Sequence, residues 1–187
     1  MKSPMNYTPA KSLADTILLN LRPECQRIEI AGSLRRLKPV VGDIELLAVP
    51  DTTPDLFGVA QFDSSGVDAL LHRLAAERGW KILKSGPRHK QVDLGPIALD
   101  LYLCPAPEWG SQFVIRTGPA DYSHWLVTHR REGGAMPGYL RQKDGRLWNG
   151  SQVLNTPEEA DYYAALGLPW IEPEKRQAPA NFQTKKE

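Results

Sequence analysis

Two acidic residues, Asp43 and Glu45, stand two positions apart in an apolar run that ends at Val49. In a β-strand alternate side chains share a face, so both carboxylates are expected on one face, with Ile44 and Leu46 on the other. Carboxylates held this close repel each other, and a cation between them relieves that repulsion. The pair therefore predicts a site for a hard divalent cation such as Mg²⁺, which prefers carboxylate oxygens together with substrate phosphates. The alternative is an ordinary amphipathic strand with both acids in water.

Groups suited to phosphate binding precede the acidic pair. Gly32 and Ser33 form a small-residue turn that offers backbone and hydroxyl donors, and Arg36 offers a charged fork that matches phosphate oxygens. The turn lies upstream of Asp43, in the same short stretch of chain. Together the turn and the acids favour a combined phosphate and metal site over the amphipathic strand.

Asp100 is a third candidate ligand. The segment 97–103 alternates so that Ile97, Leu99, Leu101 and Leu103 share one face, which leaves Asp100 on the opposite face. An acid at that position would ligate the same metal if its strand lies beside the strand that carries the other two acids. The spacing alone leaves this question open.

The remaining patterns predict the elements that position these side chains. Helical spacing runs from Thr8 and Pro9 to Leu21, before Pro23, and a second amphipathic helix is capped by Ser65 and closed by Gly79. The fold expected is α+β: a mixed sheet with two helices on one face, followed by a small subdomain of helices and a hairpin. Strands are expected at 27–30, 43–49, 80–83, 90–94 and 97–103, a hairpin turn at 143–145, and an irregular segment or weak edge strand at 51–63.

Composition limits the classes of protein that fit. A chain of 187 residues with a net charge of +1 is one domain, or one domain with a small subdomain, and any basic surface on it must be local. Two clusters meet that condition, and each has the alternative of being an ordinary solvated face. The first cluster is Arg73, Arg78, Lys81, Lys84, Arg88 and Lys90, and the second is Arg130, Arg131, Arg141, Lys143 and Arg146.

Cysteine usage and hydropathy indicate the compartment. Cys25 and Cys104 are too few and too far apart for a metal knuckle or a disulfide framework. The N-terminus has no signal-like apolar core, and no apolar run approaches the length of a membrane span. We therefore expect a cytoplasmic protein with no membrane partner.

Taken together, these motifs resemble a known family. The Gly32-Ser33 turn, Arg36, Gly42-Asp43-Ile44-Glu45 and Leu99-Asp100-Leu101 resemble the nucleotidyltransferase palm of the DNA polymerase beta superfamily. The segments FVIRTGPADYSHWLVTHRREGG (113–134) and LGLPWIEPEKR (166–176) resemble the Thr-Gly turn with its helix and the closing pattern of family X DNA polymerases. The resemblance is strongest to the minimal viral members, which have a palm and a C-terminal subdomain only. It implies a palm at 1–105, a C-terminal subdomain at 106–176 and a flexible tail at 177–187.

The resemblance implies roles for individual residues. Asp43, Glu45 and Asp100 would ligate two Mg²⁺ ions, with Mn²⁺ as a substitute, and Asp100 would receive the proton of the primer 3′-hydroxyl. The incoming triphosphate would be held by Gly32, Ser33, Arg36 and Gly42, and the nucleotide sugar would be lined by Thr117 and Gly118. DNA would be contacted by Lys81, Lys84, Arg88, Lys90, Arg130 and Arg141. The family's turn contains a cis peptide, and a cis bond is expected at Gly118–Pro119 because proline lowers its cost to about 0.5–1 kcal/mol.

The sequence also departs from the family pattern. Glu45 replaces the usual Asp, and Ala98 replaces a basic residue common two positions before the third acid. Ile115 and Arg116 stand where many members carry an aromatic pair that excludes the ribose 2′-hydroxyl. We expect a monomeric DNA-directed DNA polymerase that uses dNTPs to fill short gaps during repair. The alternatives are a template-independent nucleotidyltransferase that uses rNTPs or an RNA end, and a non-catalytic palm that binds nucleic acid.

Overall fold

The computed structural model describes residues 4–52 and 62–182. The chain divides into two compact units, Met1–Pro105 and Ala106–Glu187. Most of the segment expected to be irregular or a weak edge strand, residues 53–61, lies outside the described residues, as does the end of the tail, residues 183–187. Within the described part of the chain, no helix has the length and apolar character that crossing a membrane requires.

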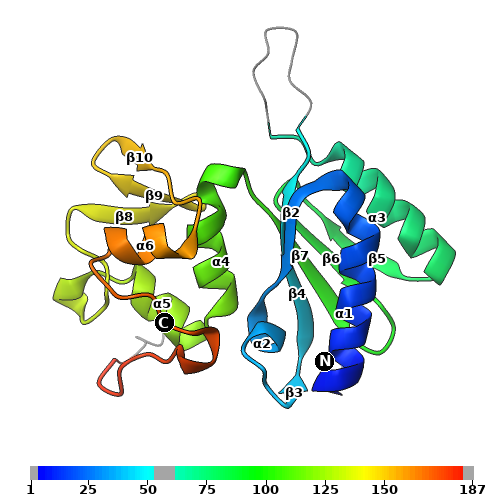
Figure 1. Ribbon diagram of the computed structural model, residues 1–187, viewed down its shortest axis with the longest axis horizontal. Coiled ribbons are helices and arrows are strands. Elements are labelled where there is room, and N and C mark those ends of the chain that lie inside the picture. The colour runs from blue at the N-terminus through cyan, green and yellow to red at the C-terminus, as the bar shows by residue number, and fades with distance from the viewer. Residues whose placement is uncertain (1–3, 53–61, 183–187) are drawn as a thin grey trace, which may run out of the picture. The chain divides into compact units, whose positions relative to one another are not determined.

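The first unit is built on a five-stranded mixed sheet of order β2-β4-β7-β6-β5 (Figure 1). Strands β4 and β7 run parallel, and every other neighbouring pair in this sheet is antiparallel. The α+β fold with a mixed sheet is therefore confirmed. The strands are β2 (Cys25–Ile30), β4 (Asp43–Pro50), β5 (Lys81–Ser85), β6 (His89–Asp93) and β7 (Ala98–Leu103), and a separate antiparallel pair is formed by β1 (Met5–Asn6) and β3 (Val40–Val41).

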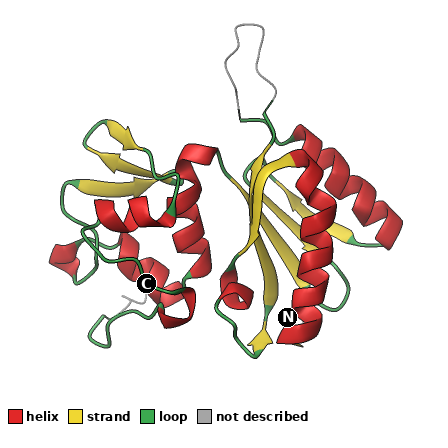
Figure 2. Ribbon diagram, in the orientation of Figure 1, coloured by secondary structure: helices red, strands yellow, loops and turns green. Residues whose placement is uncertain are grey.

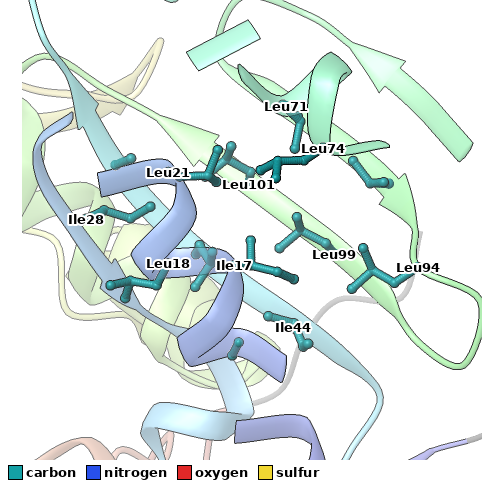
Figure 3. Packing of buried hydrophobic residues seen from close by; sticks show 14 of the residues in the cluster. Ile17, Leu18, Leu21, Ile28, Ile44, Leu71, Leu74, Leu94, Leu99 and Leu101 are labelled. Atoms are coloured by element: carbon teal, nitrogen blue, oxygen red, sulfur yellow. The ribbon is translucent and has the colours of Figure 1, made fainter. Parts of the chain in front are cut away.

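Two helices, α1 (Tyr7–Leu21) and α3 (Ser65–Arg78), cover one face of this sheet. Figure 3 shows Ile17 and Leu21 of α1 among side chains from α3 and from the central strands. The N-cap of α1 is Asn6, two residues before Thr8, where the helical spacing of the sequence begins, and α1 is followed by the 3₁₀ turn η1 (Arg22–Glu24). Helix α3 ends as expected, because Gly79 adopts the left-handed conformation with φ of 69°.

The second unit combines short helices with a three-stranded antiparallel sheet of order β10-β9-β8 (Figure 2). The expected hairpin is confirmed: Asp144 and Gly145 both have positive φ, 52° and 80°, as a two-residue hairpin turn requires. The elements are η2 (Ala106–Glu108), α4 (Trp109–Thr117), α5 (Ala120–Val127), η3 (Arg130–Glu132), β8 (Leu140–Lys143), β9 (Arg146–Asn149), β10 (Gln152–Leu154), α6 (Glu159–Ala165) and η4 (Pro173–Lys175).

A buried ion pair fixes the C-terminal segment of this unit. Arg176 is only 1% exposed, and its two terminal nitrogens donate to the two carboxylate oxygens of Glu159 over 2.9 and 3.0 Å. Its Nε donates to the Ile171 carbonyl over 3.0 Å, and its guanidinium carbon lies 5.6 Å from the ring centre of Tyr163. All three nitrogens of this buried guanidinium therefore donate to groups inside the unit, so the role of Arg176 is structural.

Candidate functional site

The acidic residues meet on the face of the first sheet that lies opposite α1 and α3. In the parallel pair of β4 and β7, Glu45 is level with Asp100, and Asp43 is level with Ala98. Side chains level with each other on neighbouring strands share a face, whereas Ile44 is fully buried in the core on the other side. The strand of Asp100 thus neighbours the strand that carries Asp43 and Glu45, as the sequence analysis required of a third ligand.

The electrostatics of Asp43 reflect this arrangement. Burial raises the pKa of its carboxyl above the usual 3.8, the charge of Asp100 raises it further, and Arg36 acts in the opposite direction. Asp43 and Asp100 are therefore close enough for their charges to oppose each other. A bound cation would remove this repulsion.

Asp100 is held by two side chains from the neighbouring strand β6. His89 Nε2 lies 2.6 Å from Asp100 Oδ1, and Gln91 Nε2 donates to the same oxygen over 3.2 Å. The ring of His89 also stacks on Tyr102, with ring centres 4.6 Å apart and 9° between the planes. His89 is therefore a strand residue whose ring is held by both Asp100 and Tyr102. Alternation in the sequence predicts a strand that starts only at Lys90, one residue after His89, and so gives no signal for this network.

Glu45 packs against the turn that precedes the strand. Gly32 has φ of +58°, and a Cβ built on it would lie 1.8 Å from Glu45 Oε2. The backbone N–H of Ala31 donates to the carbonyl of Glu45 over 2.8 Å, which joins this turn to β4. Glycine is required at position 32 both for its backbone conformation and for the space that the Glu45 side chain occupies.

The polar groups expected to bind phosphate lie in this turn, in the short helix α2 (Gly32–Arg35) and beside it. The hydroxyl of Ser33 is buried and has no hydrogen-bond partner among the described atoms. Arg36 lies close enough to Asp43 to influence its pKa. Gly42 is exposed, and a Cβ there would meet nothing within 4 Å, so no steric requirement explains a glycine at that position.

The carboxylates present are chemically suited to a hard cation, although they do not form a complete set of metal ligands. Among residues 4–52 and 62–182, no group of three or more His, Cys, Asp or Glu side chains is arranged so that it could hold a metal ion. The carboxylate of Glu45 lies against Gly32, while Asp43 and Asp100 form the electrostatically coupled pair. Carboxylate oxygens are the ligands that Mg²⁺ and Mn²⁺ prefer, and Mg²⁺ commonly takes only one or two from the protein.

The expected sugar-binding turn belongs to the second unit, at the end of α4. Thr117 is fully buried, and Gly118 lies in an extended conformation with φ of −62° and ψ of 150°. The prediction of a cis bond at Gly118–Pro119 is wrong, because the described residues contain no cis peptide. The physical reason is that an extended trans linkage already leads into α5, for which Pro119 is the N-cap. A Cβ at Gly118 would lie 2.8 Å from Ser123 Oγ, so glycine is required there by close packing.

Most of the residues expected to bind DNA are at the surface, but Lys90 is not. It is 1% exposed and its ammonium group is paired with Asp68 of α3, so it cannot reach a phosphate. That prediction is wrong because Lys90 shares its strand face with Val92, which is fully buried in the core. Lys81 and Lys84 are exposed on the edge strand β5, and Arg88 lies half-buried with its guanidinium 5.4 Å from the Phe62 ring centre.

The two DNA candidates of the second unit differ in how they are held. Arg130 donates through Nε to the Ala135 carbonyl over 3.1 Å and through Nη2 to the Leu166 carbonyl over 2.6 Å. Arg141 is exposed and its guanidinium lies 5.5 Å from the ring centre of Trp148. Arg130 therefore tethers backbone segments, while Arg141 presents a cation beside an aromatic ring, an arrangement that nucleic-acid-binding surfaces use.

A protein-family match covers the part of the chain that includes Asp100. A search of the curated proteins gave no match. The family model described as DNA polymerase beta thumb matches residues 69–177, a range that begins in α3, includes β5 to β7 and continues to the residue after Arg176. Asp43 and Glu45 lie before the matched range. Since the match spans more than half of the 187 residues, the chain belongs to the DNA polymerase beta thumb family.

Proposed function

We propose that this protein is a family X-like DNA polymerase that adds a dNMP to a primer 3′-hydroxyl, filling short gaps in DNA. The observation that carries the proposal is the coupled pair Asp43 and Asp100, on neighbouring parallel strands of one sheet, in a chain of the polymerase beta thumb family. Two carboxylates whose charges oppose each other in a half-buried site favour bound cations.

In this proposal, different residues of the first unit bind the metal ions and the triphosphate. Asp43, Glu45 and Asp100 would hold two Mg²⁺ ions, which lower the pKa of the attacking hydroxyl and stabilise the charge on the leaving pyrophosphate. The unpartnered hydroxyl of Ser33 and the guanidinium of Arg36 are suited to triphosphate oxygens. Asp100 is the proposed acceptor of the hydroxyl proton.

DNA binding in this proposal rests on exposed cations of both units. Lys81 and Lys84 on β5 and Arg141 on β8 are the surface candidates that remain once buried Lys90, half-buried Arg88 and the backbone-bonded Arg130 are set aside. Because phosphate contacts release counterions, affinity for gapped DNA is expected to fall steeply as salt rises. Replacing Lys81 and Lys84 with glutamine should weaken binding and lower that salt dependence.

A non-catalytic nucleic-acid-binding protein is the second candidate function. The observation that favours it is the position of Glu45, whose carboxylate lies against Gly32, together with the lack of a three-ligand metal group in the described part of the chain. A protein of this kind would bind gapped DNA equally well with and without Mg²⁺ and would add no nucleotide.

The test is extension of a labelled primer across a one-nucleotide DNA gap, with each dNTP and each rNTP supplied singly in Mg²⁺. Templated dNTP addition that is lost in Asp100→Ala, and retained in the control Asp15→Ala, supports the proposal. Asp15 suits the control because it lies on α1, where it pairs with Lys11. Addition without regard to template, or of rNTPs only, indicates a template-independent nucleotidyltransferase, and no addition by any variant indicates the binding protein.

A further inference from the structure

The side chains that hold Asp100 form a defined arrangement on two antiparallel strands. Gln91 is level with Asp100, and His89 is level with Tyr102, so all four side chains lie on the same face of the sheet. His89 reaches diagonally along this face to Asp100 while its ring remains stacked on the residue directly opposite. The ring is therefore constrained at its face by Tyr102 and at its edge by the carboxylate.

The hydrogen bonds fix one oxygen of Asp100 in particular. Oδ1 receives both the 2.6 Å contact from His89 and the 3.2 Å bond from Gln91. Among the described residues, Oδ2 has only a long contact of 3.5 Å, to Gln91. An ionised carboxylate accepts hydrogen bonds and donates none, so with Asp100 ionised the donor in this contact is His89 Nε2. Two donors on one oxygen hold the plane of the carboxylate and leave the second oxygen for another ligand.

We infer that His89 and Gln91 are positioning residues that hold Asp100 in the orientation in which it binds the catalytic cation. This inference rests on the proposed polymerase function and assigns a role to two residues that need not touch substrate. Hydrogen-bond partners of metal ligands orient those ligands, and their removal typically costs about 10- to 100-fold in metal affinity or activity. Side-chain exposure is 32% for His89 and 11% for Asp100, so water can replace the lost donor only in part.

The position of His89 and Gln91 within the sheet explains why these two donors are held in fixed positions. His89 and Gln91 begin a strand whose next neighbour, β7, carries the acid, and both strands lie inside the five-stranded sheet. Groups on strands are held more rigidly than groups on loops, which suits a contact that must keep one carboxylate orientation. The buried pair of Lys90 with Asp68 anchors β6 to α3 between these two positions.

The inference is tested by Mn²⁺ binding to the metal-free, nucleotide-free protein, measured by titration calorimetry. The variants are His89→Ala, Gln91→Ala and His89→Gln, with His72→Ala, on the exposed side of α3, as the matched histidine control. We expect affinity to fall about 10- to 100-fold in His89→Ala, to recover partly in His89→Gln, which keeps an N–H donor, and to be unchanged in His72→Ala. Thermal unfolding of each variant verifies that it is folded.

A kinetic measurement on the same variants separates positioning from general loss of structure. We expect kcat for single-nucleotide addition to fall in His89→Ala while KM for the dNTP changes little, because the hydrogen bond from His89 holds Asp100 and not the triphosphate. Unchanged or tighter Mn²⁺ binding in a folded His89→Ala variant would overturn the inference while leaving the polymerase proposal in place. Wild-type protein that neither binds Mn²⁺ nor adds a nucleotide would overturn both.

Discussion

The buried pair of Arg176 and Glu159 allows a stability prediction of definite size. Arg176→Met removes both hydrogen bonds to the Glu159 carboxylate, whose side chain is 8% exposed. The same carboxylate also accepts the 3.2 Å bond from Trp170 Nε1, which this substitution leaves in place. Breaking a buried ion pair from one side costs about 3–5 kcal/mol because a charge is left buried without its partner.

The assay is urea unfolding followed by tryptophan fluorescence. Four of the five tryptophans, all but Trp80, lie in the second unit, so the signal reports mainly on the part of the chain that the pair holds together. We expect the free energy of unfolding of that transition to fall by about 3–5 kcal/mol, with the m-value unchanged. The double variant Glu159→Leu/Arg176→Met should lose less than the single variant, since no charge is left buried.

The control is an exposed arginine of the same unit. Arg131 is 80% exposed and pairs with Glu132 at the surface, so Arg131→Met should change the free energy of unfolding by no more than about 0.5 kcal/mol. A loss below about 1 kcal/mol for Arg176→Met would refute the reasoning. So would a double variant that is less stable than the single one.

Three further predictions concern the first unit. Burial and the charge of Asp100 raise the pKa of the Asp43 carboxyl, so the folded protein binds a proton at Asp43 more tightly than the unfolded chain and loses stability as pH rises above 3.8. Asp43→Asn should therefore raise the melting temperature of the metal-free protein at pH 7, and an unchanged melting temperature would contradict this. Gly32→Ala should lower the free energy of unfolding by about 1–3 kcal/mol in urea titration, because an alanine at φ of +58° is strained and its Cβ meets the Glu45 side chain. An unchanged urea midpoint would contradict this prediction. Burial, aided by the charges of Asp51 and Glu24, raises the pKa of Cys25 to about 12, so iodoacetamide at pH 8 should modify this thiol only in urea. Mass spectrometry that finds Cys25 alkylated in the native protein would contradict a buried, protonated thiol.

Much of the first unit could be predicted from alternation and helical spacing. The pattern placed Asp43 and Asp100 each opposite the apolar face of its own strand, because residues such as Ile44 and Leu99 must be buried. What alternation could not supply was the pairing of strands. The contact of His89 with Asp100 is diagonal across two antiparallel strands, and it depends on a register that no local pattern encodes.

The errors have physical causes of a similar kind. The charge of Lys90 predicts a surface position, but its alternation with Val92 places it on the core face, where Asp68 of α3 pairs with it. The Gly118–Pro119 bond was expected to be cis from the resemblance, but the helix that follows begins directly from an extended trans linkage. In both cases a partner distant in the sequence, or the path of the following element, decided the outcome.

The central claim is that Asp43 and Asp100 act together in metal-dependent nucleotide addition. The direct measurement is the rate of dNMP addition across a one-nucleotide gap in Mg²⁺ for wild type, Asp43→Ala, Asp100→Ala and the double variant. Residues that act as a unit have non-additive effects, so we predict that each single variant loses roughly 1,000-fold or more and that the double variant loses little beyond that. Nucleotide addition that persists in the double variant at the wild-type rate would contradict the claim.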